Sequence, residues 1–392
     1  MTRQVDDQRQ AWLALAGAPG VGEATFARLC AHFGGPEAVL AAAHERRLAR
    51  EGPVDARGRR LPSIVVEAVA EAARDPSAAA RAIGTHGLWA ITQLDRAYPT
   101  RLEVLEVPPP VIYGWGDPAC LETPFAVAVM GTSRPAPVGR MLAARLARHL
   151  VLIGAVVVSG LAFGIDGAAH AATVEAGGRT VAVIGGGHAR PGPRAHRALI
   201  DELVAGGGAL ISEVAPDIAP RKGSFPRRNR LIAALADAVI VVEAPARSGA
   251  LNTAHHALEQ GRPLYVVPGR PGDPSVAGCL RLLRETPAHP LIGLAELDED
   301  LAAAGLPPLP GGRSTDGSPG PADPASLPGL GPAEAAVAAA VARTPGGFEL
   351  IVASTGLAPG VVSGAVTLLQ LRGLVRVSDG VVMPAGPLLD AG

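Results

Sequence analysis

The stretch AVAVMGTSRPAPVGRMLAARLARHLVLIGAVVVSG, residues 126–160, decides the fold. It begins with the short apolar run Ala126–Met130, continues through an expected helix at 138–152 and ends in a second apolar run, Ala155–Ser159. Short, nearly continuous apolar strands that alternate with helices indicate a parallel sheet covered on both faces. In such sheets, ligands bind beyond the carboxyl ends of the strands.

The same alternation continues to residue 270. Further apolar runs are Thr180–Ile184, Ala209–Glu213, Ala238–Glu243 and Leu264–Val267, and helical stretches at 166–176, 194–205, 227–236 and 249–260 lie between them. We therefore expect an α/β fold, an extended Rossmann-like, doubly wound and mainly parallel sheet, in a domain at 124–300. Residues 86–123 are expected to connect it to the N-terminal part, and Trp89–Thr92 is typical of a short strand.

Residues 1–85 predict a small helical domain. A glycine-containing turn at 16–22 precedes the amphipathic run Ala24–Phe33, an order found both in SAM-like bundles and in helix-hairpin-helix units. In the second case the turn amides can face a phosphate. We favour a plain helical turn, because such turns are common and basic neighbours are sparse.

The C-terminal part predicts a linker and a third domain. Residues 301–330 are rich in Pro, Gly, Ser and Asp, which is typical of a flexible linker. Residues 331–392 show three helical segments and a hairpin signal at Ser378–Gly380, the order of a winged-helix-like domain. The third helix, at 361–371, has no basic face, so we favour a protein-contact or vestigial role over reading of duplex DNA.

Composition limits the function classes. The 392 residues carry a formal net charge of −1, so any nucleic-acid site must be local. Cys30, Cys120 and Cys279 are far apart, which predicts reduced thiols and neither a metal site nor disulfides. The polar N-terminus is unlike a signal peptide and no long apolar run is free of charges or breakers. We expect a cytoplasmic protein without a membrane segment.

Two loops after predicted strands have the composition of phosphate sites. In Gly131-Thr132-Ser133-Arg134-Pro135, glycine permits close backbone approach, while hydroxyls, amides and the Arg134 guanidinium can bind phosphate oxygens. The loop at 159–166 brings two glycines and a serine to the start of a helix, which Asp166 can cap. His170 on that helix is expected to be a packed histidine rather than a base.

Two further loops follow later strands. Residues 220–230 hold five basic side chains, Lys222 among them, and Phe225, which can stack on a base or pin the loop. Arg228 and Arg230 fall on different faces of the helix that they start, so one can point to the pocket while the other braces the structure. In the loop 244–254, Ser248 and Gly249 open a helix, which indicates either a phosphate seat or an ordinary N-cap. Four such loops at one sheet edge predict a phosphate-bearing ligand.

Other functions are disfavoured by missing motifs. The chain has no GxxxxGK[ST] loop, no GxGxxG at its first helix and no nucleophile beside an evident base, so we expect no cofactor and no catalytic residue. A lysine-decarboxylase-like phosphoribohydrolase is the enzyme alternative, but it should carry PGGxGTxxE where this chain has VPGRPG at 267–272. An interaction scaffold, in which the sheet is structural and the tail recruits a partner, remains open.

Several motifs together resemble the DprA family of bacterial DNA-processing proteins, also called Smf. They are GTSRP (131–135), SGLAFGIDGAAH (159–170), FPRRNRLIAAL (225–235) and VVEAPARSGALNTA (241–254), in matching order and spacing. The resemblance implies a homodimer that binds single-stranded DNA without catalysis and loads RecA recombinase onto it, in natural transformation and recombination. It implies DNA contacts by Gly131, Ser133, Arg134, Ser159, Gly160, Gly164, Phe225, Arg228, Asn229, Arg230, Ser248 and Gly249. Phe163 departs from the family, whose members often carry Arg or Lys there.

Overall fold

The computed structural model describes residues 2–55, 57–221, 223–306, 330–378 and 380–385. The chain forms two compact units, 1–310 and 311–392. Most of the expected linker, Lys222 and the last seven residues lie outside the described residues. Helix α13 (Leu294–Ala303) extends into the first three positions of the expected linker.

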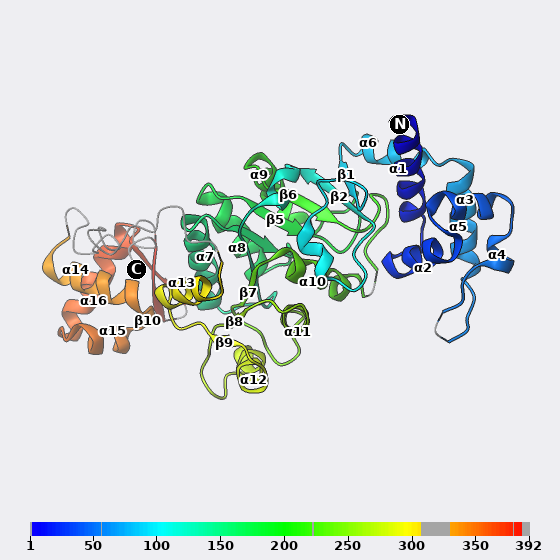
Figure 1. The fold of residues 1–392 in the computed structure, drawn as a ribbon. Coiled ribbons are helices and arrows are strands. Elements are labelled where there is room, and N and C mark those ends of the chain that lie inside the picture. Colours follow the sequence, from blue (N-terminus) through cyan, green and yellow to red (C-terminus); the bar gives the residue numbers. More distant parts are fainter. Residues whose placement is uncertain (1, 56, 222, 307–329, 379, 386–392) are drawn as a thin grey trace. The chain divides into compact units, whose positions relative to one another are not determined.

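The first unit is built on a nine-stranded sheet of order β1-β2-β6-β5-β4-β3-β7-β8-β9 (Figure 1). Strands β3 to β9 pair in parallel, while β1 and β2 are antiparallel at one edge. The bounds are β1 Trp89–Thr92, β2 Val111–Gly116, β3 Ala126–Met130, β4 Val156–Ser159, β5 Thr180–Val183, β6 Ala209–Ser212, β7 Ala238–Val241, β8 Leu264–Val266 and β9 His289–Pro290. The predicted mainly parallel α/β fold is confirmed.

Strand order reverses at β3, which pairs with β4 on one side and β7 on the other. Val127 is opposite Val157 in one pair and Ala238 in the other. The chain therefore leaves β3 and β7 toward opposite faces of the sheet, and their loops start side by side at its carboxyl edge. This is the position at which doubly wound sheets bind ligands.

Helices cover both faces of the sheet. Ala128 and Met130 pack with α10 and α11 on one face, while Val127 and Val129 pack with α7 and α8 on the other. This two-sided burial explains why the strands read as continuous apolar runs. The helices are α7 Pro137–Leu152, α8 Ile165–Glu175, α9 Arg197–Ala205, α10 Ser224–Leu235, α11 Ala250–Glu259 and α12 Ala277–Glu285, with 3-10 turns η1 Thr100–Val104, η2 Pro118–Glu122, η3 Arg194–His196 and η4 Pro274–Val276.

The helix expected at 227–236 begins three positions earlier, within the basic segment 220–230. Helix α10 begins at Ser224, so Phe225–Arg230 form its first two turns. Gly223, at φ +92°, reverses the chain before the helix, and Pro226 is tolerated because a first-turn N–H has no helical partner. The FPRRNR side chains are therefore held on a helix.

The N-terminal helices are α1 Thr2–Gly17, α2 Glu23–Phe33, α3 Pro36–His44, α4 Leu48–Glu51, α5 Ser63–Arg74 and α6 Ala78–Thr85. Their core gathers Leu15, Phe26, Leu29 and Val69. Between α1 and α2 the chain turns tightly, with Gly20 at φ +87° and the Val21 amide bonded to the Ala18 carbonyl. Helix α1 also packs on the sheet edge, where Leu13 joins Val111 and Tyr113 of β2.

The second unit contains α14 Pro332–Arg343, α15 Phe348–Thr355, α16 Pro359–Leu371, β10 Gly346–Gly347, β11 Val375–Ser378 and β12 Val381–Pro384, with strand order β10-β12-β11. Three helices and a hairpin confirm the predicted winged-helix order. Helix α16 exposes Val361, Leu368 and Leu371 and has no basic face. In the described part of the chain no single helix is long and apolar enough to cross a membrane, although α15 and α16, bent by 111°, pass that test as a pair.

Candidate functional site

The loop after β3 presents an exposed arginine. Arg134 is exposed, and its guanidinium has no hydrogen bond or ion pair with any described residue. The loop itself is held from below: the Thr132 amide donates to the Glu243 carbonyl at 2.7 Å, and the Ala136 amide donates to the Glu243 carboxylate at 3.0 Å. A rigid loop with a free guanidinium can bind an oxyanion without losing an internal partner.

Glu243 is a site residue that the sequence reasoning missed. It lies two positions after the end of β7 and is 4% exposed. Burial raises the pKa of its carboxyl, whereas the bond from the Ala136 amide opposes that shift. A glutamate close to the end of a buried strand was the available signal, because a buried acid needs a donor and a loop amide supplies one.

The loop after β4 lies against the first loop. Gly164 has φ +82°, and a Cβ there would come within 2.4 Å of the Thr132 carbonyl oxygen. The Ile165 amide donates to that same oxygen at 3.2 Å. Leu161 is buried in a left-handed conformation, φ +56°, that costs free energy and persists because the surrounding contacts fix it. Ser159 is buried, and its hydroxyl donates to the Val129 carbonyl at 2.7 Å.

Asp166 and His170 lie beneath these loops. The Asp166 carboxylate accepts from the Gly160 amide at 3.2 Å, while Gly164 is the N-cap of α8, so the expected capping role is replaced by a loop contact. His170 is fully buried at 2.7 Å from the Thr180 hydroxyl, which itself donates to the Val157 carbonyl. Burial lowers the pKa of His170 to about 3. The prediction of a packed histidine is confirmed.

Arg228 is buried under the strand ends, contrary to a solvent-facing role. Its guanidinium donates to the Gly160 carbonyl at 2.6 Å and to the Val183 carbonyl. Burial lowers its pKa to about 10, and the nearby Asp166 opposes the shift. Asn229 is also buried; it accepts from Arg228 and donates to the Gly249 carbonyl at 3.3 Å. Together they tie three strand-end loops to α10.

Arg230 points to the other side of α10. It pairs with Glu213, whose side chain is 7% exposed, and donates to the Val107 carbonyl at 3.3 Å. Both Arg228 and Arg230 therefore make bridging contacts, and Arg228 also lines a cavity next to Gly185, in line with our expectation that one of the two points to a pocket. Among the described residues of this segment, the exposed cations are Arg227 and Arg221, which the sequence reasoning did not single out. Helical geometry sends adjacent side chains in different directions, and only packing decides which of them meets solvent.

The remaining predicted residues lie at the same edge. Phe225 is 56% exposed and lies against Gly185, and Gly185 lines a cavity of about 330 Å³ together with Arg221, Ser224 and Arg227. The Ser248 hydroxyl accepts from the Ala250 amide at 3.3 Å, one position before Gly249, the N-cap of α11. Gly131 and Ser133 lie in the β3 loop beside Arg134. Among the described residues no cluster of His, Cys, Asp and Glu could hold a metal ion.

Comparison with known proteins assigns the family. The family model of DNA recombination-mediator protein A matches residues 89–302. A DprA winged helix domain matches 321–380, and a DprA-like N-terminal HHH domain matches 6–72. The chain belongs to the DprA family. The family is one of DNA recombination mediators, which favours that role over nucleotide hydrolysis.

Relatives and solved structures agree. Protein Smf of Synechocystis is 32% identical over 94% of this chain and 96% of its own length. DNA processing protein DprA of Bacillus subtilis is 39% identical over 51% of this chain and 67% of its own. The crystal structure of DprA from Streptococcus pneumoniae superposes with a TM-score of 0.55 at 31% identity, over 67% of this chain and 91% of that one. DNA processing protein A of Helicobacter pylori, described for its single-stranded DNA binding mode, gives 0.50 at 32%, over 55% and 96%.

The match at 6–72 corrects one prediction. It supports a helix-hairpin-helix unit, so the preference for a plain helical turn was wrong. That preference rested on sparse basic residues near the turn in the sequence. In the folded chain Arg221 and Arg227 of the α/β domain line a cavity with the turn, a neighbourhood that only the tertiary structure creates.

Proposed function

We propose that this chain binds single-stranded DNA at the carboxyl edge of its parallel sheet without catalysis. The observation that supports this proposal most is that a cationic side chain is exposed at that edge while neighbouring carboxylates are buried. Arg134 and the ring of Phe225 are exposed there, while Asp166 and Glu243 are buried and the Glu213 side chain is only 7% exposed. A strand would therefore meet cations, amides and one aromatic ring, the combination typical of sequence-tolerant binding.

The twelve residues carried over from the family then divide into two groups. Seven lie in loops or on an exposed helical turn and are proposed to touch DNA: Gly131, Ser133, Arg134, Gly164, Phe225, Ser248 and Gly249. Five hold those loops in place through buried or bridging contacts: Ser159, Gly160, Arg228, Asn229 and Arg230. The division follows from burial and hydrogen bonding: the Nε and Nη1 donors of Arg228, for example, are taken by Asn229 and two backbone carbonyls, which fixes its position in the scaffold.

The test is a titration of a labelled single-stranded oligonucleotide against a duplex of equal length at two salt concentrations. We expect the single strand to bind more tightly, with affinity that falls as salt rises and depends little on base composition. Arg134→Ala should weaken binding strongly. Equal affinity for strand and duplex, or unchanged binding by Arg134→Ala, would contradict the proposal.

The finer steps of the role are proposed from the family resemblance. They are a homodimer, transfer of the bound strand to RecA recombinase in the cytoplasm, and service in natural transformation and recombination. The second unit supports a protein-contact role, because α16 exposes apolar side chains where a DNA-reading helix would carry cations. Deleting 330–392 should leave strand binding intact and reduce recombinase loading; loss of strand binding instead would assign that unit to DNA.

A further inference from the structure

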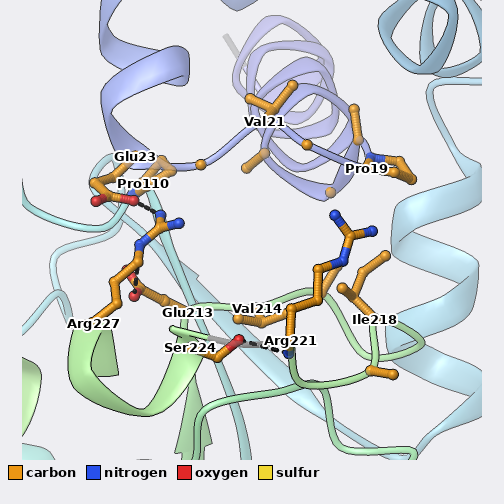
Figure 2. A pocket seen from close by; sticks show the side chains of 17 residues that line it. Pro19, Val21, Glu23, Pro110, Glu213, Val214, Ile218, Arg221, Ser224 and Arg227 are labelled. Carbon is orange, nitrogen blue, oxygen red and sulfur yellow. Dashed lines mark hydrogen bonds and ion pairs between the residues drawn. The ribbon is translucent and has the colours of Figure 1, made fainter. Parts of the chain in front are cut away.

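A second cavity lies where the helical domain meets the α/β domain. It measures about 160 Å³ and is bordered by the turn 16–23 of the helical domain and the segment 213–227 of the α/β domain. Figure 2 shows Arg221 reaching across it toward Pro19 and Val21, with Arg227 beside Glu23 on the far wall. Arg221, Ser224 and Arg227 also line the cavity next to Gly185, so the two cavities adjoin along one segment.

Charges around this cavity form a network across the two domains. Arg227 pairs with Glu23 and lies 3.6 Å from Glu213, while Arg230 pairs with Glu213 and lies 3.7 Å from Glu23. Three of these side chains are at most 15% exposed, whereas Arg227 is 47% exposed. Two carboxylates thus balance two guanidiniums, and Arg230–Glu213 is the inner pair while Arg227–Glu23 is the outer one.

Arg221 adds an unbalanced charge to this cavity. The local turn orients it: the Arg221 amide donates to the Ser224 hydroxyl at 2.8 Å, and the Ser224 amide donates to the Arg221 carbonyl at 3.0 Å. Its guanidinium is exposed and makes no hydrogen bond or ion pair with any described residue. A fixed backbone with an unpaired cation over a cavity is suited to an external anion.

An anion already occupies part of the cavity, since the Glu23 carboxylate is held by Arg227. Carboxylate and phosphate oxygens use the same face of a guanidinium. The geometry points to a second phosphate site for the bound strand, formed by Arg221 and Arg227, at which Glu23 of the helical domain competes with the DNA backbone for Arg227. This inference rests on the proposed function, because the strand must first be held at the adjoining strand-end loops.

The inner pair explains how the competition can be reversible. When a phosphate replaces Glu23 at Arg227, the Glu23 carboxylate keeps Arg230 nearby, and Arg230 keeps Glu213. No buried charge is left without a partner, so the exchange avoids the large cost of an isolated buried ion. The helical domain would thereby set the affinity of the site through a single carboxylate.

The experiment measures binding of a labelled oligothymidine, long enough to pass both sites, to the full chain over a series of salt concentrations. Glu23→Gln should tighten binding about twofold to fivefold, the range of an exposed ion pair, and steepen the slope of log K against log salt by about 0.7, one phosphate contact on a single strand. Arg221→Gln should weaken binding by a similar factor and make the slope shallower by about 0.7.

Arg145→Gln is the matched control. Arg145 is exposed on α7 and unpaired with described residues, so its loss removes the same net charge elsewhere. If Arg221→Gln behaves like this control, or if a folded Glu23→Gln binds unchanged or more weakly, the second site is overturned. If Glu23→Gln does not fold, the result for Arg221→Gln decides whether the second site exists. That variant should fold, because the Arg221 guanidinium makes no hydrogen bond or ion pair with any described residue. If the unmodified chain binds no single strand, the proposed function itself is overturned. If Arg134→Ala weakens binding but Arg221→Gln and Glu23→Gln have no specific effect, only this inference is overturned.

Discussion

The loop 131–135 and the first turns of α10 lie at the same sheet edge and both carry arginine, yet they use it in opposite ways. Arg134 is exposed and unpaired with described residues, whereas Arg228 is 5% exposed and donates to two backbone carbonyls. A loop that follows a strand extends beyond the sheet. A helix that crosses the strand ends turns some of its side chains inward. The same residue type thus serves a ligand in one place and the scaffold in the other.

The physical reason lies in the backbone at the strand ends. The carbonyls of Gly160 and Val183 are buried where their strands stop, and a buried carbonyl without a donor is costly. Arg228 supplies the donors, and Gly160 is required because a Cβ there would come within 2.6 Å of the guanidinium. Arg228 of the FPRRNR motif is therefore held in place by the fold itself, independently of DNA.

The largest expected effect is on stability, and it distinguishes Arg228 from Arg134. Arg228→Glu places a carboxylate against the carbonyls and near Asp166, and should lower the free energy of unfolding by about 3–5 kcal/mol. Arg134→Glu, with the same charge change at an exposed position, should change it by less than about 0.5 kcal/mol. Urea unfolding of both variants is the measurement. Equal destabilisation would show that the comparison is wrong.

The next effect concerns affinity. Arg134→Ala should weaken single-strand binding about tenfold to a hundredfold, the value of a charged hydrogen bond, and make the salt slope shallower by about 0.7. Its thermal unfolding should stay unchanged, because the guanidinium makes no hydrogen bond or ion pair with any described residue. Anisotropy titrations and a thermal melt on the same sample check both halves. A lowered melting temperature with an unchanged salt slope would assign Arg134 to the scaffold.

Low pH should lower the free energy of unfolding through His170, which is buried beneath the loops of the site. Burial lowers the pKa of His170 to about 3, so the folded state keeps it neutral while the unfolded state takes up a proton below pH 6.5. The free energy of unfolding therefore keeps the full contribution of His170 above pH 6.5 and falls as pH drops, by about 2 kcal/mol at pH 5. The pKa of His188 is also lowered by burial, so His170→Asn should reduce the pH dependence without removing it. If the free energy of unfolding of His170→Asn depends on pH as strongly as that of the unmodified chain, His170 is not the source of the acid sensitivity.

The smallest expected effect is a gain. Phe163 is 51% exposed beside Gly164, with its ring 4.9 Å from that of His196. Phe163→Arg should add a cation to the exposed side of the site, tighten single-strand binding about twofold to fivefold and steepen the salt slope by about 0.7. Phe163→Gln is the control for loss of the ring. The same affinity in both variants would place residue 163 outside the path of the strand.

The sequence predicted the sheet and its ligand edge because apolar strands buried on both faces leave a strong local pattern, as in Ala126–Met130. It also predicted His170 as a packed residue. It did not reveal Glu243, whose partner amide at Ala136 is more than a hundred positions away in the chain. It misassigned the exposed cations of 220–230, since the choice between Arg227 and Arg228 depends on what α10 packs against.

The sequence by itself determined the family, through motifs such as FPRRNR and GTSRP, and the α/β class, through alternating apolar strands and helices. Those properties are local, because periodicity and motif spacing are written along the chain. Only the tertiary structure decided which arginines are free. It also brought the turn of the helical domain to Arg227, where Glu23 lies. Burial and ion pairing depend on neighbours distant in sequence, so no reading of the segment alone contains them.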